Sequence, residues 1–270
     1  MTMSLPTFET LSFKEIEPRI GLVTLNRPDR LNALNERMLD AFDELLRNLD
    51  RDDAIRVLIL TGAGRGFCAG ADLKEVALRA QTEAFADPEA FLGLVQEKYS
   101  GLISKLRGVR QPIVAAVNGA AAGGGMALAL AADIRVCTPE AYFVASFINI
   151  GLSGGEMGSS FLLPRMVGLS KASDILLTGR KVSAAEAEKI GLVSEVAPPG
   201  KLLEAALSYA RMMTAKTTGG LKFTKRVLEQ NLTSSSLEAA MNLENRNQAI
   251  MIFSGEFQKV IGAFSKISFP

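Results

Sequence analysis

Residues 58–73 read LILTGAGRGFCAGADL, and residues 114–126 read VAAVNGAAAGGGM. Each stretch begins with an apolar run that predicts a buried strand, continues through several glycines, and leads into a segment that predicts a helix. A helix start leaves backbone N–H groups without partners, and glycine lets the backbone approach a ligand closely. If the two loops converge, two N–H donors would surround one oxygen atom, as in an oxyanion hole.

The same glycines have two other interpretations. They can serve only to make tight turns and close helix–strand packing. They can also belong to a dinucleotide-binding loop, but Gly62-Ala-Gly64 lacks the third glycine of the GxGxxG motif, and the second loop lacks the GxG spacing.

The surrounding sequence predicts strands that alternate with helices. Short apolar runs bounded by turn residues indicate strands, and apolar residues three and four apart indicate helices. The expected strands lie at residues 11–26 (two strands around a turn at Pro18), 56–61, 112–118 and 134–138, and the expected helices at 36–50, 88–107 and 120–132. This alternation, with strands that are apolar on both faces, is typical of a largely parallel sheet in an α/β fold.

The last part of the chain has a different character. Helical patterns dominate from about residue 157, at 158–167, 170–178, 183–190, 200–214, 217–231, 236–251 and 255–265. We therefore expect an α/β core over residues 1–198 and a helical region over residues 199–270.

The composition removes several classes of chemistry. The 270 residues include no histidine, which excludes a Ser-His-Asp or Cys-His mechanism and a histidine-ligated metal. Lys plus Arg total 30 and Asp plus Glu total 29, so no basic field argues for nucleic acid. Proton transfer is left to carboxylates, Tyr, Lys, Cys or water.

Further features favour a cytoplasmic protein. Cys68 and Cys137 form no metal or redox motif, and their scarcity fits a reducing compartment. The N-terminal residues MTMSLPTFET lack the basic and apolar segments of a signal peptide. Uninterrupted apolar runs fall short of the roughly 18 residues that a membrane span needs, so no membrane contact is expected.

Five motifs, in order and with matching spacing, resemble signatures of the crotonase superfamily, the enoyl-CoA hydratase/isomerase family. They are TLNRPDRLNAL at 24–34, FCAGADLKE at 67–75, PIVAAVNG at 112–119 with GGG at 123–125, LTGR at 177–180, and AEKIGLV at 187–193. The resemblance covers roughly residues 10–265. It implies a crotonase-like fold, with ββα repeats forming a mainly parallel sheet core and a helical C-terminal trimerisation region.

The resemblance also implies roles for particular residues. Ala71 and Gly124 match the two positions whose N–H groups bind the thioester oxygen of an acyl-coenzyme A. The matching positions around the substrate and along the CoA path are Arg30, Leu31, Ala33, Ala69, Asp72, Leu73 and Gly123. Arg30 can equally be a solvated surface charge, and a helix cap is the simpler interpretation of Asp72.

The sequence departs from the family's hydratases at both of their catalytic glutamates. The matching positions hold Ala127 and Phe147, so hydration by two positioned carboxylates is not expected. Phe147 is instead expected to fill the space of the missing side chain and to line a drier pocket, which favours isomerisation.

One candidate acid or base remains in the segment GLSGGEMGSSFLLP at 151–164. This segment resembles the loop where several family members carry a catalytic carboxylate, and Glu156 occupies that position. Glu156 can also be only a helix cap, and Glu140 and Asp133 are alternative acids.

Three functions follow from this interpretation. The first is an enzyme acting on an enoyl- or dienoyl-CoA, with Glu156 moving a proton. The second is another acyl-CoA reaction, such as thioester hydrolysis or carbon–carbon cleavage. The third is a catalytically poor acyl-CoA-binding subunit. No metal or cofactor is expected beyond the coenzyme A of the substrate.

The resemblance further implies a homotrimer or a hexamer of two trimers. Phe264 matches an aromatic residue that in relatives approaches the CoA of a neighbouring subunit. Met241, Leu243, Ile250 and Ile252 are candidates for contacts between subunits, although packing within the monomer is the simpler interpretation of each.

Overall fold

The computed structural model describes residues 7–51, 53–79 and 81–265. Its main sheet has six strands in the order β1-β2-β3-β4-β6-β9. The β1–β2 pair is antiparallel, and every other neighbouring pair is parallel. The strands are β1 (Leu11–Glu17), β2 (Ile20–Leu25), β3 (Val57–Gly62), β4 (Ile113–Val117), β6 (Ile134–Cys137) and β9 (Glu195–Val196). The predicted mainly parallel α/β sheet is confirmed.

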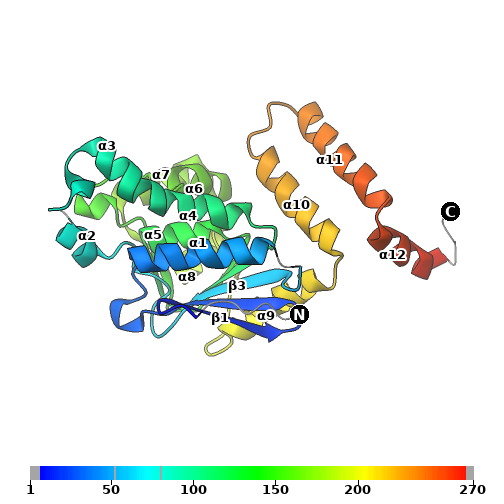
Figure 1. The fold of residues 1–270 in the computed structure, drawn as a ribbon, viewed down its shortest axis with the longest axis horizontal. Coiled ribbons are helices and arrows are strands. Elements are labelled where there is room, and N and C mark those ends of the chain that lie inside the picture. The colour runs from blue at the N-terminus through cyan, green and yellow to red at the C-terminus, as the bar shows by residue number, and fades with distance from the viewer. Residues whose placement is uncertain (1–6, 52, 80, 266–270) are drawn as a thin grey trace.

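Helices cover both faces of this sheet (Figure 1). Successive side chains of a strand point to opposite faces, so Leu58 and Leu60 of β3 pack into the core that contains α1 (Glu36–Asp50). Ile59 packs on the other side, together with Ala206 of α9 (Leu202–Thr214). Because all five residues of β4 are buried, its apolar run carries no amphipathic alternation.

A second, three-stranded sheet corrects one prediction. We expected a helix over residues 120–132, but Ala120–Ala122 form strand β5, and helix α5 runs only from Gly124 to Ala131. Strand β5 pairs with β7 (Tyr142–Val144), which in turn pairs with β8 (Lys181–Ser183). Alanine favours helices and is depleted in strands, so pairing with a distant strand overrode the local preference.

The expected helix over 88–107 is present but interrupted. Helix α3 (Pro88–Phe91) continues into a π-helical turn at Leu92–Gln96 and then into α4 (Glu97–Gly108). The remaining α-helices of the described part of the body are α2 (Leu73–Arg79), α6 (Ser159–Val167), α7 (Leu169–Thr178) and α8 (Ala184–Lys189), and short 3-10 helices lie at Pro28–Arg30, Glu83–Phe85 and Ile148–Ile150.

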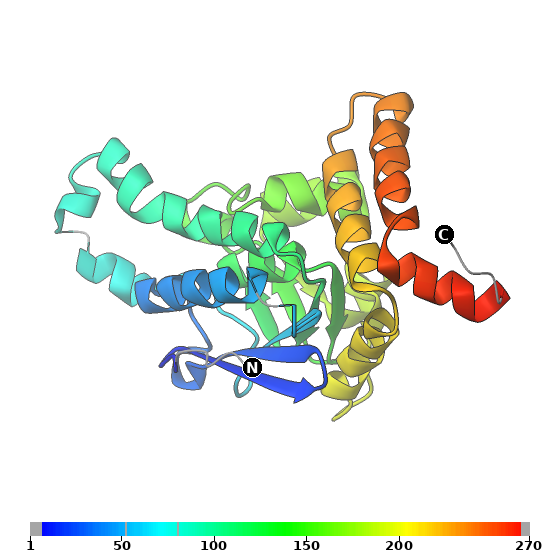
Figure 2. The same ribbon diagram turned by 45° about the vertical axis from the view of Figure 1, so that its right-hand side comes forward.

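The last three helices form an arm that projects from the body in both views (Figures 1 and 2). They are α10 (Thr218–Asn231), α11 (Leu237–Ile252) and α12 (Gly255–Ser265). Met241, Ile250 and Ile252 of α11 are exposed, and Leu243 is half-buried. Within the described ranges, no helix combines the length and apolar character needed to cross a membrane.

Candidate active site

The two glycine loops meet at Gly70 and Gly124. A Cβ atom placed on Gly70 would lie 3.2 Å from the amide nitrogen of Gly124, and one on Gly124 would lie 3.6 Å from Cα of Gly70. Gly70 also has a φ angle of +91°, which side chains rarely tolerate. The loops predicted to converge therefore touch through backbone atoms, and glycine is what permits this approach.

The N–H of Ala71 points away from Leu34, the residue that lies beside it in an isolated β-bridge. Leu34 N donates to Gly70 O at 2.7 Å, and Asp72 N donates to Leu34 O at 2.8 Å. Leu34 thus bonds to Gly70 and Asp72, the two residues that flank Ala71, in a parallel β-bridge. In this pattern the N–H of Ala71 points away from Leu34. Among the residues that the structure describes, this N–H has no hydrogen-bond acceptor.

The amide of Gly124 is also unpaired within the described ranges. Gly124 is the first residue of α5, so no preceding carbonyl of the helix can accept its hydrogen bond. The positive end of the helix dipole lies at this amide. Unpaired amides on neighbouring loops are the kind of donor that an oxyanion hole uses, and this role for Ala71 and Gly124 stays a prediction.

Phe147 packs against the same loop. A Cβ atom on Gly123, whose φ is +50°, would lie 2.9 Å from Ser146 Oγ and 3.4 Å from Cε1 of Phe147. The Phe147 side chain is buried. Ala127, the other position where hydratases carry a glutamate, is fully buried in α5. An aromatic ring thus lies beside the glycine loop, and no carboxylate is present at either position.

Glu156 lies at the edge of this site. Its N–H donates to Ser159 Oγ at 3.1 Å, and the Ser159 hydroxyl donates back to Glu156 O at 2.5 Å. The next residue, Met157, has a φ of +48°, and its sulfur lies 3.1 Å from the Cβ position of Gly124. The half-buried Glu156 is therefore one residue from a direct contact with the glycine loop.

The carboxylate of Glu156 accepts a hydrogen bond from Gln96 Nε2. Gln96 was missed at the sequence level, because the helical pattern over 88–107 does not reveal which way a polar residue in a π-turn points. The two alternative acids lie elsewhere. Asp133 accepts from Ile113 N at 2.8 Å and pairs with Lys225 at 3.0 Å, and Glu140 is exposed.

Asp72 has the contacts of a helix cap. Its Oδ1 accepts from the amides of Lys74 and Glu75 at 3.2 and 3.4 Å, and its Oδ2 pairs with Arg27 at 2.8 Å. Burial alone would raise the pKa of Asp72, but the hydrogen bonds from Arg27 and these amides outweigh burial and lower it. The capping interpretation has direct geometric support, and contact with substrate stays a prediction.

Asn32 joins the segment before α1 to the first glycine loop through hydrogen bonds. The sequence alone did not identify this role. Its Nδ2 donates to Ala63 O at 2.9 Å and to Gly66 O at 2.8 Å, and its Oδ1 accepts from Arg27 N at 2.9 Å. The side chain is fully buried. Within the motif 24–34, this asparagine therefore holds the loop in place.

The other predicted substrate contacts differ in exposure. Arg30 is exposed and lies 3.9 Å from Asp29, Ala33 is buried, and Leu73 is exposed. Leu31 O accepts from Ala69 N at 3.0 Å, which joins two of the predicted positions. The side chain of Phe264 lies outside the described residues. Substrate binding by all of these residues stays a prediction.

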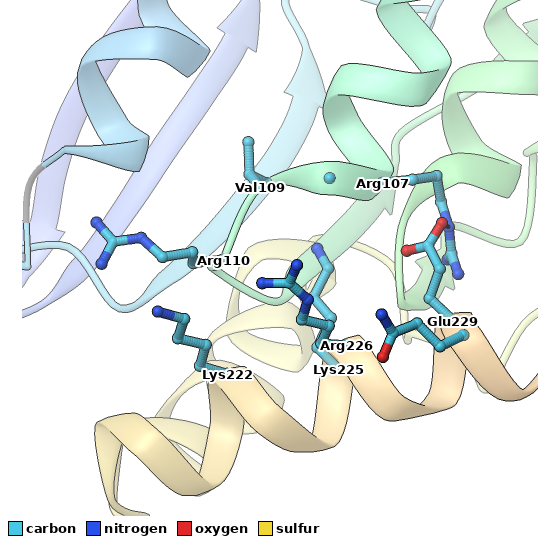
Figure 3. Close-up of a pocket in the computed structure, with 9 residues that line it drawn as sticks. Arg107, Val109, Arg110, Lys222, Lys225, Arg226 and Glu229 are labelled. Atoms are coloured by element: carbon cyan, nitrogen blue, oxygen red, sulfur yellow. Dashed lines mark hydrogen bonds and ion pairs between the residues drawn. The ribbon is translucent and has the colours of Figure 1, made fainter. Parts of the chain in front are cut away.

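A basic hollow between α4 and α10 is a separate feature (Figure 3). In Figure 3, Lys222, Lys225, Arg226 and Glu229 of α10 face Arg107 and Arg110. Arg107 pairs with Glu229 at 3.3 Å, and Lys225 pairs with Asp133 at 3.0 Å. These pairs fasten the arm to the body, and none of the predicted site residues lines the hollow.

Comparisons with known proteins identify the family of the chain. The family model described as enoyl-CoA hydratase/isomerase matches residues 15–267. A Mycobacterium tuberculosis protein named "Probable enoyl-CoA hydratase EchA12" is 44% identical over 91% of this chain and 86% of its own length. The Escherichia coli 1,2-epoxyphenylacetyl-CoA isomerase is 36% identical over 92% and 93%. The crystal structure of a monofunctional enoyl-CoA isomerase from M. smegmatis matches with a TM-score of 0.73 and 42% identity, covering 86% and 98%.

Proposed function

Since the chain belongs to the enoyl-CoA hydratase/isomerase family, we propose that it isomerises an enoyl- or dienoyl-CoA thioester through an enolate. In this proposal the amides of Ala71 and Gly124 bind the thioester oxygen, and Glu156 is the proton shuttle. The observation that carries the proposal is the close approach of two loops beside Met157, each of which holds an amide that is unpaired within the described part of the chain.

The proposed reaction needs one base and one oxyanion site. Glu156 removes a proton from the saturated carbon next to the thioester carbonyl, and the electron pair of the broken C–H bond moves toward the carbonyl oxygen as the enolate forms. The two amides stabilise that charge more strongly than they stabilise the neutral carbonyl, which lowers the barrier. Glu156 then returns the proton to a different carbon, so the double bond has moved and no atom is gained or lost.

The side chains beside the glycine loop favour isomerisation over hydration. Adding water by the family's two-carboxylate route needs a pair of positioned acids, and the corresponding positions hold Ala127 and Phe147. The Phe147 ring against Gly123 supports a dry pocket, in which a carboxylate exchanges protons with the substrate rather than with solvent.

We place the substrate's coenzyme A along Arg30, Leu31, Ala33, Ala69, Asp72 and Leu73, and require no cofactor beyond it.

We also propose a cytoplasmic homotrimer, or a hexamer of two trimers. The projecting arm supports this assembly, because Met241, Ile250 and Ile252 of α11 expose apolar surface. Sedimentation equilibrium would then give three or six times the 28.9-kDa mass of the chain, and a monomer would rule this assembly out.

A panel of thioesters tests the reaction. The purified protein is mixed with crotonyl-CoA, a 3-enoyl-CoA and a 3,5-dienoyl-CoA, and the absorbances of the conjugated products are followed. We expect turnover of a 3-enoyl or 3,5-dienoyl substrate, and a loss of about 10²-fold or more in Glu156→Gln. Release of free thiol instead would favour hydrolysis, and binding without turnover of any thioester would favour an acyl-CoA-binding subunit.

A further inference from the structure

The π-turn at Leu92–Gln96 lies where the long helix passes the Glu156 loop. A π-turn inserts one extra residue, so the residues beyond it are rotated relative to a regular α-helix. Gln96 is the last residue of this turn, and its side chain reaches Glu156, which is 60 positions later in the sequence. Such turns are frequent at functional sites, and this one brings a polar amide to the candidate proton shuttle.

The backbone and the carboxylate of Glu156 are hydrogen-bonded by different residues. Ser159 holds its backbone through both the N–H and the carbonyl group. In the part of the chain that the structure describes, Gln96 Nε2 is the group that donates a hydrogen bond to the carboxylate, and it does so to Oε1. The backbone of Gln96 is in turn tied to α4, because Ser100 Oγ donates to Gln96 O at 3.2 Å.

We infer that Gln96 is a positioning residue that holds Oε1 of Glu156 and leaves Oε2 as the oxygen that exchanges the proton with substrate. The amide nitrogen of glutamine can only donate, so the oxygen it contacts must act as an acceptor. The Gln96 hydrogen bond favours Oε1 as the carbonyl-type oxygen, and the inference therefore assigns the exchanged proton to Oε2. This inference rests on the proposed function, and it adds the atom through which the proton passes and the residue that orients it.

A substitution that removes the donor and keeps the length tests this role. Gln96→Met has a side chain of similar size without an amide. We expect kcat to fall about 10-fold or more, as for the loss of a hydrogen bond to a charged group, while KM changes less than about threefold. Gln96→Lys, which keeps a donor, should retain more activity than Gln96→Met. Gln230→Met, an exposed glutamine on α10, is the matched control and should leave kcat unchanged.

The double variant separates positioning from a merely structural contact. If Gln96 acts through Glu156, then adding Gln96→Met to Glu156→Gln lowers kcat no further. The positioning role would be overturned, and the proposed function left standing, if Gln96→Met has the kcat of the wild type. The same holds if Gln96→Met lowers kcat by the same factor in the wild-type and Glu156→Gln proteins. If Glu156→Gln turns over substrate as fast as the wild type, the positioning role and the proposed function are both overturned. If Gln96→Met fails to fold, Gln96→Ala, which also lacks the donor, is compared in the wild-type and Glu156→Gln proteins and decides in the same way.

Discussion

The sulfur atom of Met157 lies 3.1 Å from the point that a Cβ atom on Gly124 would occupy. This contact joins the loop that carries Glu156 to the loop that carries one of the two unpaired amides. Met157 adopts a φ of +48°, a conformation that is uncommon for a residue with a side chain. The segment that carries the candidate base therefore packs, through the Met157 side chain, against the loop that carries the Gly124 amide.

Replacement of Phe147 by alanine should lower the stability of the protein and let water into the candidate active site. Phe147→Ala removes a buried ring and should lower the free energy of unfolding by about 3 kcal/mol, measured by urea denaturation. Because the ring packs against Gly123, its removal admits water near the thioester, and we expect the ratio of thioester hydrolysis to isomerisation to rise. An unchanged ratio would show that Phe147 does not keep water from the reacting group.

Loss of Asn32 should loosen the first glycine loop. Asn32→Ala leaves the carbonyls of Ala63 and Gly66 without their buried donor, which should cost about 1–3 kcal/mol of unfolding free energy. Asn242→Ala on the exposed face of α11 is the control and should change stability by less than about 0.5 kcal/mol. Equal effects of the two substitutions would mean that the Asn32 bonds do not stabilise the fold.

The ion pair of Asp72 with Arg27 predicts a pH-dependent contribution to stability. The folded-state pKa of Asp72 is lowered, so its stabilisation is complete above the unfolded-state value, which is about 3.9. It is lost as the pH falls through the lower, folded-state value. Compared with the wild type, Asp72→Asn should be less stable by about 1–3 kcal/mol near neutral pH.

This stability difference should shrink as the solution is acidified below about pH 4. Unfolding by urea at a series of pH values measures it. Asp40→Asn, at an exposed carboxylate 4.0 Å from Lys98, serves as the control and should change stability by less than about 1 kcal/mol. If the difference in unfolding free energy between Asp72→Asn and the wild type stays constant down to the most acidic pH, the lowered pKa of Asp72 would be contradicted.

The sequence predicted the fold class and the strands that lead into both glycine loops, because those strands have clear apolar patterns. It could not predict that Ala120–Ala122 form a strand, since three alanines carry no periodic signal and the pairing partner Tyr142–Val144 is distant. The direction of Gln96 depends on a π-turn inside a helical pattern. Contacts made across the fold, rather than local preference, placed these residues.

The most direct test of the oxyanion site is the carbonyl stretching frequency of bound butyryl-CoA labelled with carbon-13 at the thioester. Hydrogen bonds from two amides should shift the band of the bound thioester to lower wavenumber than in water. Gly124→Pro removes the N–H at a position where proline suits a helix start, and Gly124→Ala is the control because it adds a Cβ atom and keeps the N–H.

We predict that the wild type and Gly124→Ala show the shift, and that Gly124→Pro loses much of it together with about 10²–10³-fold in kcat. A bound carbonyl in the wild-type protein with the same frequency as in water would contradict the account. So would an equal shift in Gly124→Pro and Gly124→Ala.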